Sequence, residues 1–215
     1  VVTAGLALKA VEDGKRVAVM KAVQTGASAK NGDFGFVRRI VPEIGRYPSD
    51  RCVPYSFPFP ASPHLASRIS GAKISISRIK ACYRSLLADE PDIVLIEGAG
   101  GIYVPIKGRV MMIDLIESLS VPVILVARSG LGTINHTLLS INALRSRGIR
   151  LAGVVMNRFP SRKDIVAEDN AHTISRLGGV SVIAKIREIP ELSMAAPQAS
   201  AALIRKALSR KFNEI

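Results

Sequence analysis

The chain has 215 residues, of which 48% are hydrophobic, so it can bury a full core as one domain over residues 1–215. No apolar run approaches the roughly 20 residues that a membrane-spanning helix needs, and the first residues lack the layout of a secretion signal. We therefore expect a soluble, cytoplasmic protein without a membrane partner. Its two cysteines, Cys52 and Cys82, have no metal-ligand spacing and are expected to be reduced.

The net charge is +13, from 30 Lys and Arg residues against 17 Asp and Glu residues. The basic residues are scattered over several predicted helices, and no aromatic residues alternate with them as in a platform that stacks bases. We expect solvated helix faces and no specific nucleic-acid partner, with nonspecific affinity for polyanions at low salt.

The chain begins with a predicted helix, a strand and a loop. Val1 to Gly14 has Ala and Leu at helical spacing, and Arg16 to Val23 is apolar and β-branched enough for a buried strand. Lys21 stands near the carboxyl end of that strand. Gln24 to Asp33 is a polar, glycine-containing loop that ends in a carboxylate and is long enough to wrap a ligand.

The segments that follow show weak secondary-structure signals until a helix is predicted at residues 74–88. Phe34 to Ile44 is weakly helical, whereas the four prolines in Arg51 to His64 rule out a central strand or a continuous helix. We expect an extended surface loop there, a candidate lid or site wall. Ile74 to Ala88 predicts an amphipathic helix.

The stretch from Asp92 to Ile106 reads DIVLIEGAGGIYVPI. Ile93 to Ile96 is typical of a strand covered on both faces, and Glu97 follows where that strand ends. Ligands of open α/β sheets bind beyond the carboxyl ends of the strands, and the following glycines let the backbone approach a ligand. A strand followed by a flexible turn with a solvated Glu97 is an equally good interpretation of this segment alone.

The second half continues the alternation of strands and helices. Buried strands are predicted at Val121 to Ala127, Leu151 to Met156 and Val180 to Ala184. Helices are predicted at Asp114 to Leu119, from Thr133 onward, at Lys163 to Leu177 and at Ala199 to Lys211. This pattern predicts an α/β fold with three layers, in which a doubly wound, mainly parallel sheet lies between helices.

Polar residues gather at the predicted strand ends. The turn at Arg128 to Gly132 leads into a helix whose first N–H groups, at Thr133, Ile134 and Asn135, can hold an anion. Together with Lys21, Asp33, Glu97 and Asn157, this set suits Mg²⁺, a phosphorylated nucleotide and a carboxylate-bearing substrate. Each residue also has a plainer explanation, because Asn-Gly-Asp is ordinary turn chemistry and Asn157 could cap the segment that follows it.

Six segments resemble the dethiobiotin synthetase family, which is part of the P-loop nucleotide-binding group. They are KAVQTG (21–26), PYSFPFPASPHLAS (54–67), VLIEGAGGIYVPI (94–106), VPVILVARSGLGTINH (121–136), LAGVVMN (151–157) and EIPEL (188–192). The resemblance implies an ATP-dependent cyclo-ligase of biotin biosynthesis that carboxylates 7,8-diaminononanoate with CO₂, phosphorylates the carbamate and closes a ureido ring. It implies Mg²⁺ as cofactor and ATP as co-substrate.

The same resemblance implies roles for individual residues. Lys21 would be catalytic and neutralise the carbamate and the transferring phosphoryl group, and Thr25 would hydrogen-bond the carbamate or phosphate. Asp33 and Glu97 would hold Mg²⁺, with Glu97 also meeting the nucleotide. The diamine would contact Gly100, and the distant carboxylate would bind Thr133, Ile134 and Asn135 of a neighbouring subunit, which implies a homodimer. The adenine would meet Asn157, Ile189 and Pro190.

The sequence departs from the family pattern in two respects. The family's glycine-rich P-loop is expected immediately before Val1, so catalysis is expected if upstream sequence supplies that loop. Arg187 stands where relatives often have Gly, and Asp169 where some have a substrate-binding Tyr. Two alternatives stay open: a partitioning-type P-loop ATPase that works as a nucleotide-dependent dimer switch, and a noncatalytic fragment without the P-loop.

Overall fold

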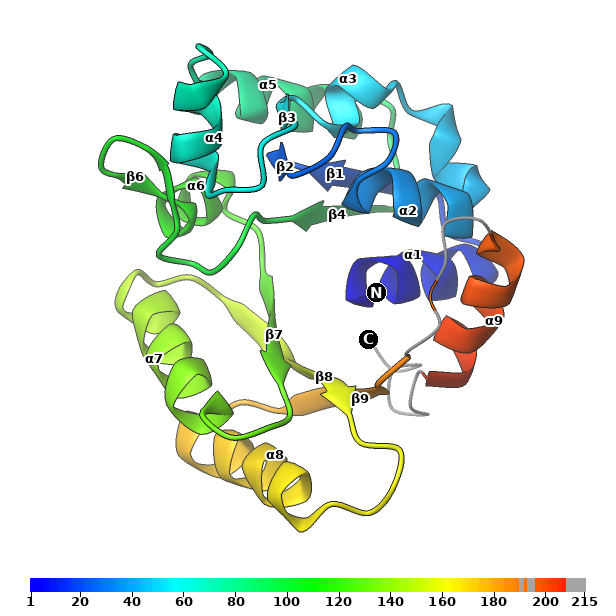
Figure 1. The fold of residues 1–215 in the computed structure, drawn as a ribbon, viewed down its shortest axis with the longest axis vertical. Coiled ribbons are helices and arrows are strands. Elements are labelled where there is room, and N and C mark those ends of the chain that lie inside the picture. The colour runs from blue at the N-terminus through cyan, green and yellow to red at the C-terminus, as the bar shows by residue number, and fades with distance from the viewer. Residues whose placement is uncertain (190–191, 193–195, 208–215) are drawn as a thin grey trace. The chain divides into compact units, whose positions relative to one another are not determined.

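A computed structural model of the protein describes residues 1–189, 192 and 196–207 (Figure 1). Its contacts group the chain into two compact units, which divide between Leu119 and Ser120, except that Val2 is grouped with the second unit. Each unit is described by itself, and the single domain over residues 1–215 stays a prediction. Among the described residues, no helix has the length and apolar content that crossing a bilayer requires.

The first unit is built on two parallel strands. Helix α1 (Val2–Glu12) leads into β1 (Val17–Lys21), which pairs in parallel with β4 (Ile93–Glu97). Every residue of β1 is buried, as its apolar, β-branched sequence predicts. The register places Lys21 directly opposite Glu97 at the carboxyl ends of both strands. The predicted first helix and both predicted strands are therefore confirmed, but every residue of β4 is half-buried, so the expected cover on both faces of that strand is not observed among the described residues.

The segment between β1 and β4 contains more structure than the sequence suggested. Short strand β2 (Gln24–Thr25) pairs in parallel with β3 (Ser56–Phe57), so the expected loop from Arg51 to His64 is interrupted. The strand forms there because the backbone N–H of Gln24 donates to the carbonyl of Tyr55 and that of Gly26 donates to the carbonyl of Phe57. The other elements of this unit are α2 (Asp33–Ile40), η1 (Pro42–Arg46), α3 (Ser49–Cys52), α4 (Pro63–Ile69), α5 (Ile76–Leu87), β5 (Pro105–Lys107), β6 (Val110–Met111) and α6 (Met112–Leu119).

The second unit is a three-stranded parallel sheet with helical crossovers. Its strands lie in the order β7 (Val123–Arg128), β8 (Leu151–Phe159), β9 (Val182–Arg187), and its helices are α7 (Thr133–Ser146), α8 (Ile165–Gly178) and α9 (Pro197–Ala207). Helices α7 and α8 lie side by side against this sheet (Figure 1), because Ile141 and Ile174 share a core with Val154 and Met156 of the central strand. Parallel strands joined by helices confirm the predicted α/β class.

Candidate functional site

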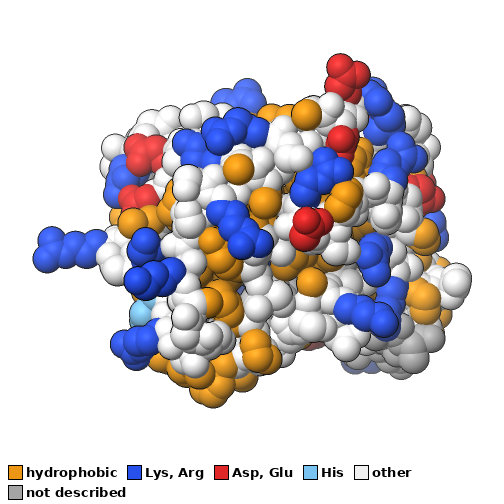
Figure 2. All heavy atoms as spheres, turned by 90° about the horizontal axis from the view of Figure 1, so that it is seen from above, with side chains coloured by type: hydrophobic (Ala, Val, Ile, Leu, Met, Phe, Trp, Pro, Cys, Tyr) orange, Lys and Arg blue, Asp and Glu red, His pale blue; other side chains and the backbone are white. Residues whose placement is uncertain are grey.

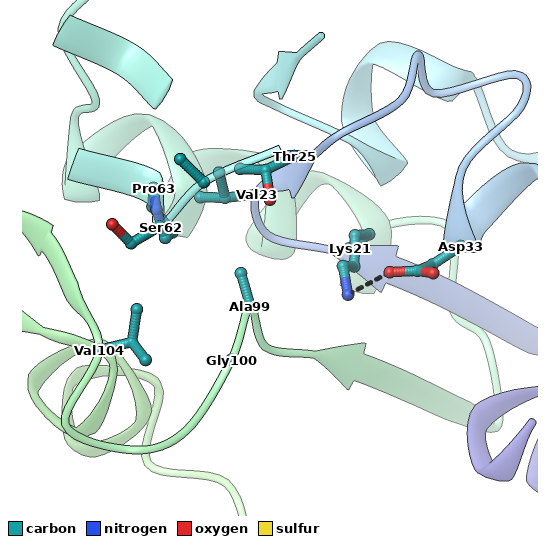
Figure 3. Close-up of a pocket in the computed structure, with 10 residues that line it drawn as sticks. Lys21, Val23, Thr25, Asp33, Ser62, Pro63, Ala99, Gly100 and Val104 are labelled. Atoms are coloured by element: carbon teal, nitrogen blue, oxygen red, sulfur yellow. Dashed lines mark ion pairs between the residues drawn. The ribbon is translucent and has the colours of Figure 1, made fainter. Parts of the chain in front are cut away.

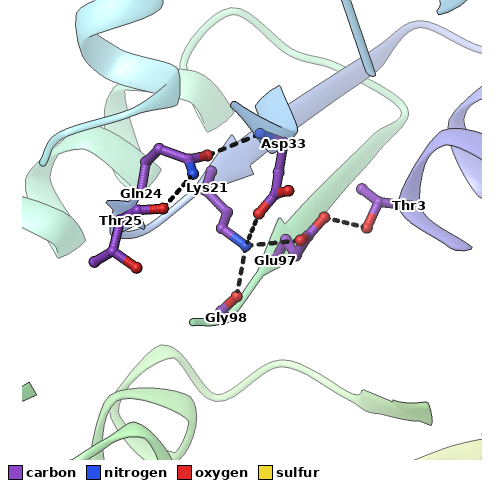
Figure 4. A network of polar contacts seen from close by, with 7 residues as sticks. All are labelled: Thr3, Lys21, Gln24, Thr25, Asp33, Glu97 and Gly98. Carbon is purple, nitrogen blue, oxygen red and sulfur yellow. Dashed lines mark hydrogen bonds and ion pairs between the residues drawn. The ribbon is translucent and has the colours of Figure 1, made fainter. Parts of the chain in front are cut away.

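A buried lysine joins two carboxylates at the carboxyl edge of the β1–β4 pair (Figure 4). The Nζ of Lys21 lies 2.7 Å from Oε1 of Glu97 and 2.7 Å from Oδ2 of Asp33, and it donates to the carbonyl of Gly98 at 3.0 Å. Only 6% of Lys21 is exposed. Burial lowers the pKa of Lys21, but the charge of Glu97 and the hydrogen bonds that Lys21 donates to Asp33 and Glu97 raise it above its usual value. The ammonium group is therefore held charged and fixed.

Sequence and topology together explain this convergence. Lys21 and Glu97 end two parallel strands, whose carboxyl ends meet at one edge of the sheet. Asp33 is the first residue of α2, where the positive end of the helix dipole favours a carboxylate. The sequence nominated all three residues, and the structure brings them together.

Two further polar side chains at this edge escaped the sequence interpretation. The hydroxyl of Thr3 donates to Oε2 of Glu97 at 2.5 Å, although the two residues lie 94 positions apart. The amide of Gln24 is buried and contacts both ends of the following loop. Neither residue had a sequence signal beyond its hydroxyl or amide group, since their partners are brought near only by folding.

A pocket of about 360 Å³ opens beside Lys21 (Figure 3). Its lining includes the nominated Lys21, Thr25, Asp33 and Gly100. It also includes residues that the sequence did not nominate individually, which are Val23, Ala61, Ser62, Pro63, Ala99 and Val104. Ala61 to Pro63 belong to the proline-rich segment, so this segment lines the pocket, while its role as a site wall stays a prediction.

Gly100 needs its glycine backbone in this pocket. Its φ is +76°, and an added Cβ would lie 2.8 Å from Cγ2 of Val104. A side chain there would both strain the turn and displace the pocket wall.

The donor set at this edge fits a magnesium ion. The described residues contain no group of three or more His, Cys, Asp or Glu side chains that could hold a metal. Mg²⁺ differs from zinc or calcium in that it is bound through one or two carboxylates, with water and substrate phosphates as its other ligands. Asp33 lines the pocket, and Glu97 contacts the same Lys21 Nζ as Asp33, so two carboxylates are available at this edge, which suits this mode of binding.

The second unit contains the turn and helix start at which the sequence predicts anion binding. Gly132 has a φ of +83° and precedes α7, whose first turn holds Thr133, Ile134 and Asn135. The hydroxyl of Thr133 is buried and donates to the carbonyl of Arg128 at 2.7 Å. The Thr133 side chain is therefore used within the turn, and it is the first N–H groups of the helix that could meet an anion.

The proposed adenine side lies in the same unit. Asn157 is paired with Arg128 across β7 and β8, and its half-buried side-chain amide has no hydrogen-bond partner in the part of the chain that the structure describes. Ile189 is half-buried just beyond β9, whereas Pro190 lies outside the described residues. Arg187 is exposed at the end of β9, and Asp169 is exposed on α8.

Comparisons with known proteins agree with this architecture. A family model described as an AAA domain matches residues 1–196. The ATP-dependent dethiobiotin synthetase of Clostridium perfringens is 37% identical over 195 residues, covering 87% of this chain and 85% of that protein. The corresponding synthetase of Paramagnetospirillum magneticum is 42% identical over 175 residues, covering 81% of this chain and 77% of that protein.

Solved structures with the same fold are more distant in sequence. The MinD cell division protein of Aquifex aeolicus matches 99% of this chain and 86% of its own, with a TM-score of 0.58 and 16% identity. A ParA family ATPase of Chlorobium tepidum matches 99% of this chain and 89% of its own, with a TM-score of 0.54 and 14% identity. At such identities the likeness establishes the fold alone, the α/β architecture of P-loop ATPases.

Proposed function

The chain belongs to the dethiobiotin synthetase family, and from that premise we propose that it is an ATP-dependent cyclo-ligase that makes dethiobiotin. Its substrates would be 7,8-diaminononanoate, CO₂ and ATP. One amine attacks CO₂ and loses a proton to give a carbamate, whose oxygen takes the γ-phosphoryl group of ATP and releases ADP. The second amine then attacks the activated carbonyl, and phosphate leaves as the ureido ring closes.

The observation that supports this proposal most strongly is the fixed charge of Lys21 at the pocket. Its ammonium group is buried, carries a raised pKa and lines the pocket together with Thr25 and Gly100. The carbamate and the transferring phosphoryl group are both anionic, and a preorganised cation in a water-poor site stabilises such charge without reorganising. We assign Lys21 this role, Thr25 a hydrogen bond to the carbamate or phosphate, and Gly100 a backbone contact with the diamine.

Asp33 and Glu97 are the proposed magnesium ligands. When bound, Mg²⁺ supplies charge neutralisation for the phosphates of ATP. Lys21 contacts both carboxylates, each at 2.7 Å, and so holds them close to one another. Oε2 of Glu97 accepts a hydrogen bond from the hydroxyl of Thr3, which fixes the orientation of the carboxylate.

The second unit would bind the adenine of ATP and the carboxylate of the diamine substrate. We propose that Asn157, Ile189 and Pro190 meet the adenine, and that the first turn of α7 at Thr133, Ile134 and Asn135 binds the carboxylate of a substrate held by a second copy of the chain. A homodimer is therefore part of the proposal, and light scattering on the purified protein tests it. A cytoplasmic location likewise remains a prediction.

The test of the function is a coupled assay on protein expressed from the complete reading frame that contains this sequence. We expect ADP release that depends on both diaminononanoate and bicarbonate, with dethiobiotin as the product identified by mass spectrometry. ADP release at the same rate with and without diaminononanoate would overturn the proposal and favour a partitioning-type ATPase. No ATP turnover at all would favour a noncatalytic role.

A further inference from the structure

The loop between Thr25 and Asp33 is held at both ends by a single buried side chain. The Nε2 of Gln24 donates to the carbonyl of Thr25 at 3.0 Å, and its Oε1 accepts from the backbone N–H of Asp33 at 3.0 Å (Figure 4). Gln24 is 3% exposed. A buried amide that uses both its donor and its acceptor on one loop fixes the separation of the loop ends.

The surroundings leave this amide little freedom. The backbone N–H of Gln24 donates to the carbonyl of Tyr55 at 2.8 Å, which anchors its main chain to β3. A Cβ added to Gly32 would lie 2.5 Å from Cδ of Gln24, so the amide packs directly against the Gly32 backbone. The sequence pattern of Gln24 followed by Gly32 and Asp33 thus has a geometric reason.

Asp33 needs such a support because its side chain is exposed. The Asp33 carboxylate is 55% exposed although it contacts the buried Lys21. Solvent screens the exposed Asp33 side of this ion pair, which weakens its contribution to fixing the position of the carboxylate. As the first residue of α2, Asp33 also has a backbone N–H without an acceptor inside the helix, and Gln24 supplies that acceptor.

We propose that Gln24 is a positioning residue that sets the place of Asp33 beside Lys21 and so tunes magnesium binding. This inference rests on the proposed function for its catalytic consequence, but its structural core concerns the ligand-free protein. Gln24 touches neither the reacting atoms nor the metal and acts through the backbone of Asp33. Groups that orient a metal ligand in this way typically change metal affinity by about 10- to 100-fold when removed.

The experiment compares two variants with a matched control. Gln24→Leu removes both hydrogen bonds at similar volume, while Gly32→Ala keeps Gln24 but pushes its amide aside. Ser56→Ala removes a different hydrogen bond to the same loop, from Oγ of Ser56 to the carbonyl of Ala27 at 3.1 Å, on the side away from Asp33. If Gln24→Leu fails to fold, Gly32→Ala decides the matter.

Two measurements are made on each protein. In the absence of ligands, we expect the backbone N–H of Asp33 to exchange its hydrogen about tenfold faster in Gln24→Leu and Gly32→Ala, because both substitutions remove its hydrogen bond to Gln24. In Ser56→Ala that bond is kept, so the exchange rate should stay the same. In the synthetase assay, we expect the half-saturating Mg²⁺ concentration to rise about tenfold in the test variants, with the change in kcat at saturating Mg²⁺ smaller.

The outcomes separate the two proposals. Unchanged Asp33 exchange and unchanged Mg²⁺ dependence in a folded variant would overturn the role of Gln24 while leaving the synthetase function intact. A wild-type protein without synthetase activity would overturn the function, and the exchange measurement would still decide whether Gln24 positions Asp33.

Discussion

Lys21 is the residue on which the proposed chemistry depends most directly. Replacing it with Ala should lower kcat by about 100-fold or more, since one preorganised electrostatic donor typically contributes that much. The measurement is steady-state turnover at saturating ATP, diamine and bicarbonate, with circular dichroism to verify the fold.

Lys9 offers a matched control for this charge removal. It lies on α1 and pairs with Asp13 one turn later, on the surface. Lys9→Ala should keep near-normal turnover because exposed pairs of this kind contribute little. Turnover of Lys21→Ala close to that of Lys9→Ala would refute the role of Lys21.

Glu97 combines two contacts on one carboxylate, with Lys21 on Oε1 and Thr3 on Oε2. Glu97→Gln keeps the shape but removes the charge that a magnesium ion needs. We expect the fold to persist and the half-saturating Mg²⁺ concentration to rise by about tenfold or more. A Mg²⁺ titration of the assay measures this, and an unchanged titration curve would exclude Glu97 as a ligand.

The two thiols of the chain should differ in reactivity. Cys52 is fully buried, and desolvation raises the pKa of its thiol to about 12. At pH 8 we expect Ellman's reagent to modify at most the half-buried Cys82 in the native protein, and both thiols in guanidinium. Cys82→Ser should therefore abolish the native-state reaction; rapid modification of that variant would contradict the burial of Cys52.

At the scale of elements, the loop before α2 folds back onto the first turn of that helix. A Cβ added to Gly35 would lie 1.9 Å from the carbonyl oxygen of Lys30, so the loop cannot keep its path if Gly35 becomes Ala. We expect Gly35→Ala to lower the free energy of unfolding by about 1–3 kcal/mol, the usual cost of overpacking. Urea denaturation measures the change.

Gly45 is the matched control because an added Cβ would meet only Cδ of Arg38, at 3.9 Å. Gly45→Ala should change the free energy of unfolding by less than about 0.5 kcal/mol. Equal effects of the two substitutions would show that the loop yields to the added methyl group.

At the scale of the whole molecule, positive charge dominates the surface chemistry. The net charge is +13, and no acidic residue occurs between Glu117 and Asp164. Figure 2 shows Lys and Arg side chains spread over the face in view, with Asp and Glu side chains and uncharged atoms between them, rather than gathered in a single patch. Such a distribution attracts polyanions, including nucleic acids, without recognising a particular base sequence.

We therefore expect weak binding to double-stranded DNA at low salt. Two duplexes of unrelated sequence should bind with equal affinity, and binding should fall by about 10³-fold or more between 50 and 200 mM salt if several phosphates are contacted. Fluorescence anisotropy measures both. A clear preference for one duplex would contradict the prediction that the protein has no specific nucleic-acid partner.

The amino-acid sequence by itself determined the α/β class and two of the three charged residues at the β1–β4 edge. Alternating apolar strands and helices predict parallel pairing, and the carboxyl ends of parallel strands share an edge, so the sequence placed Lys21 and Glu97 at that edge. The pairing of β1 with β4 then sets the two residues directly opposite one another. The glycines after Glu97 likewise predicted a turn at the pocket, where Gly100 adopts a positive φ that favours glycine.

Only the tertiary structure decided which other side chains complete the site. Asp33 follows Asn31 and Gly32, an ordinary turn sequence, and gained its place beside Lys21 through the buried amide of Gln24. Thr3 meets Glu97 across 94 positions of sequence. Hydrogen bonds between residues so far apart depend on the packing of separate elements, and no local pattern in the chain encodes that packing.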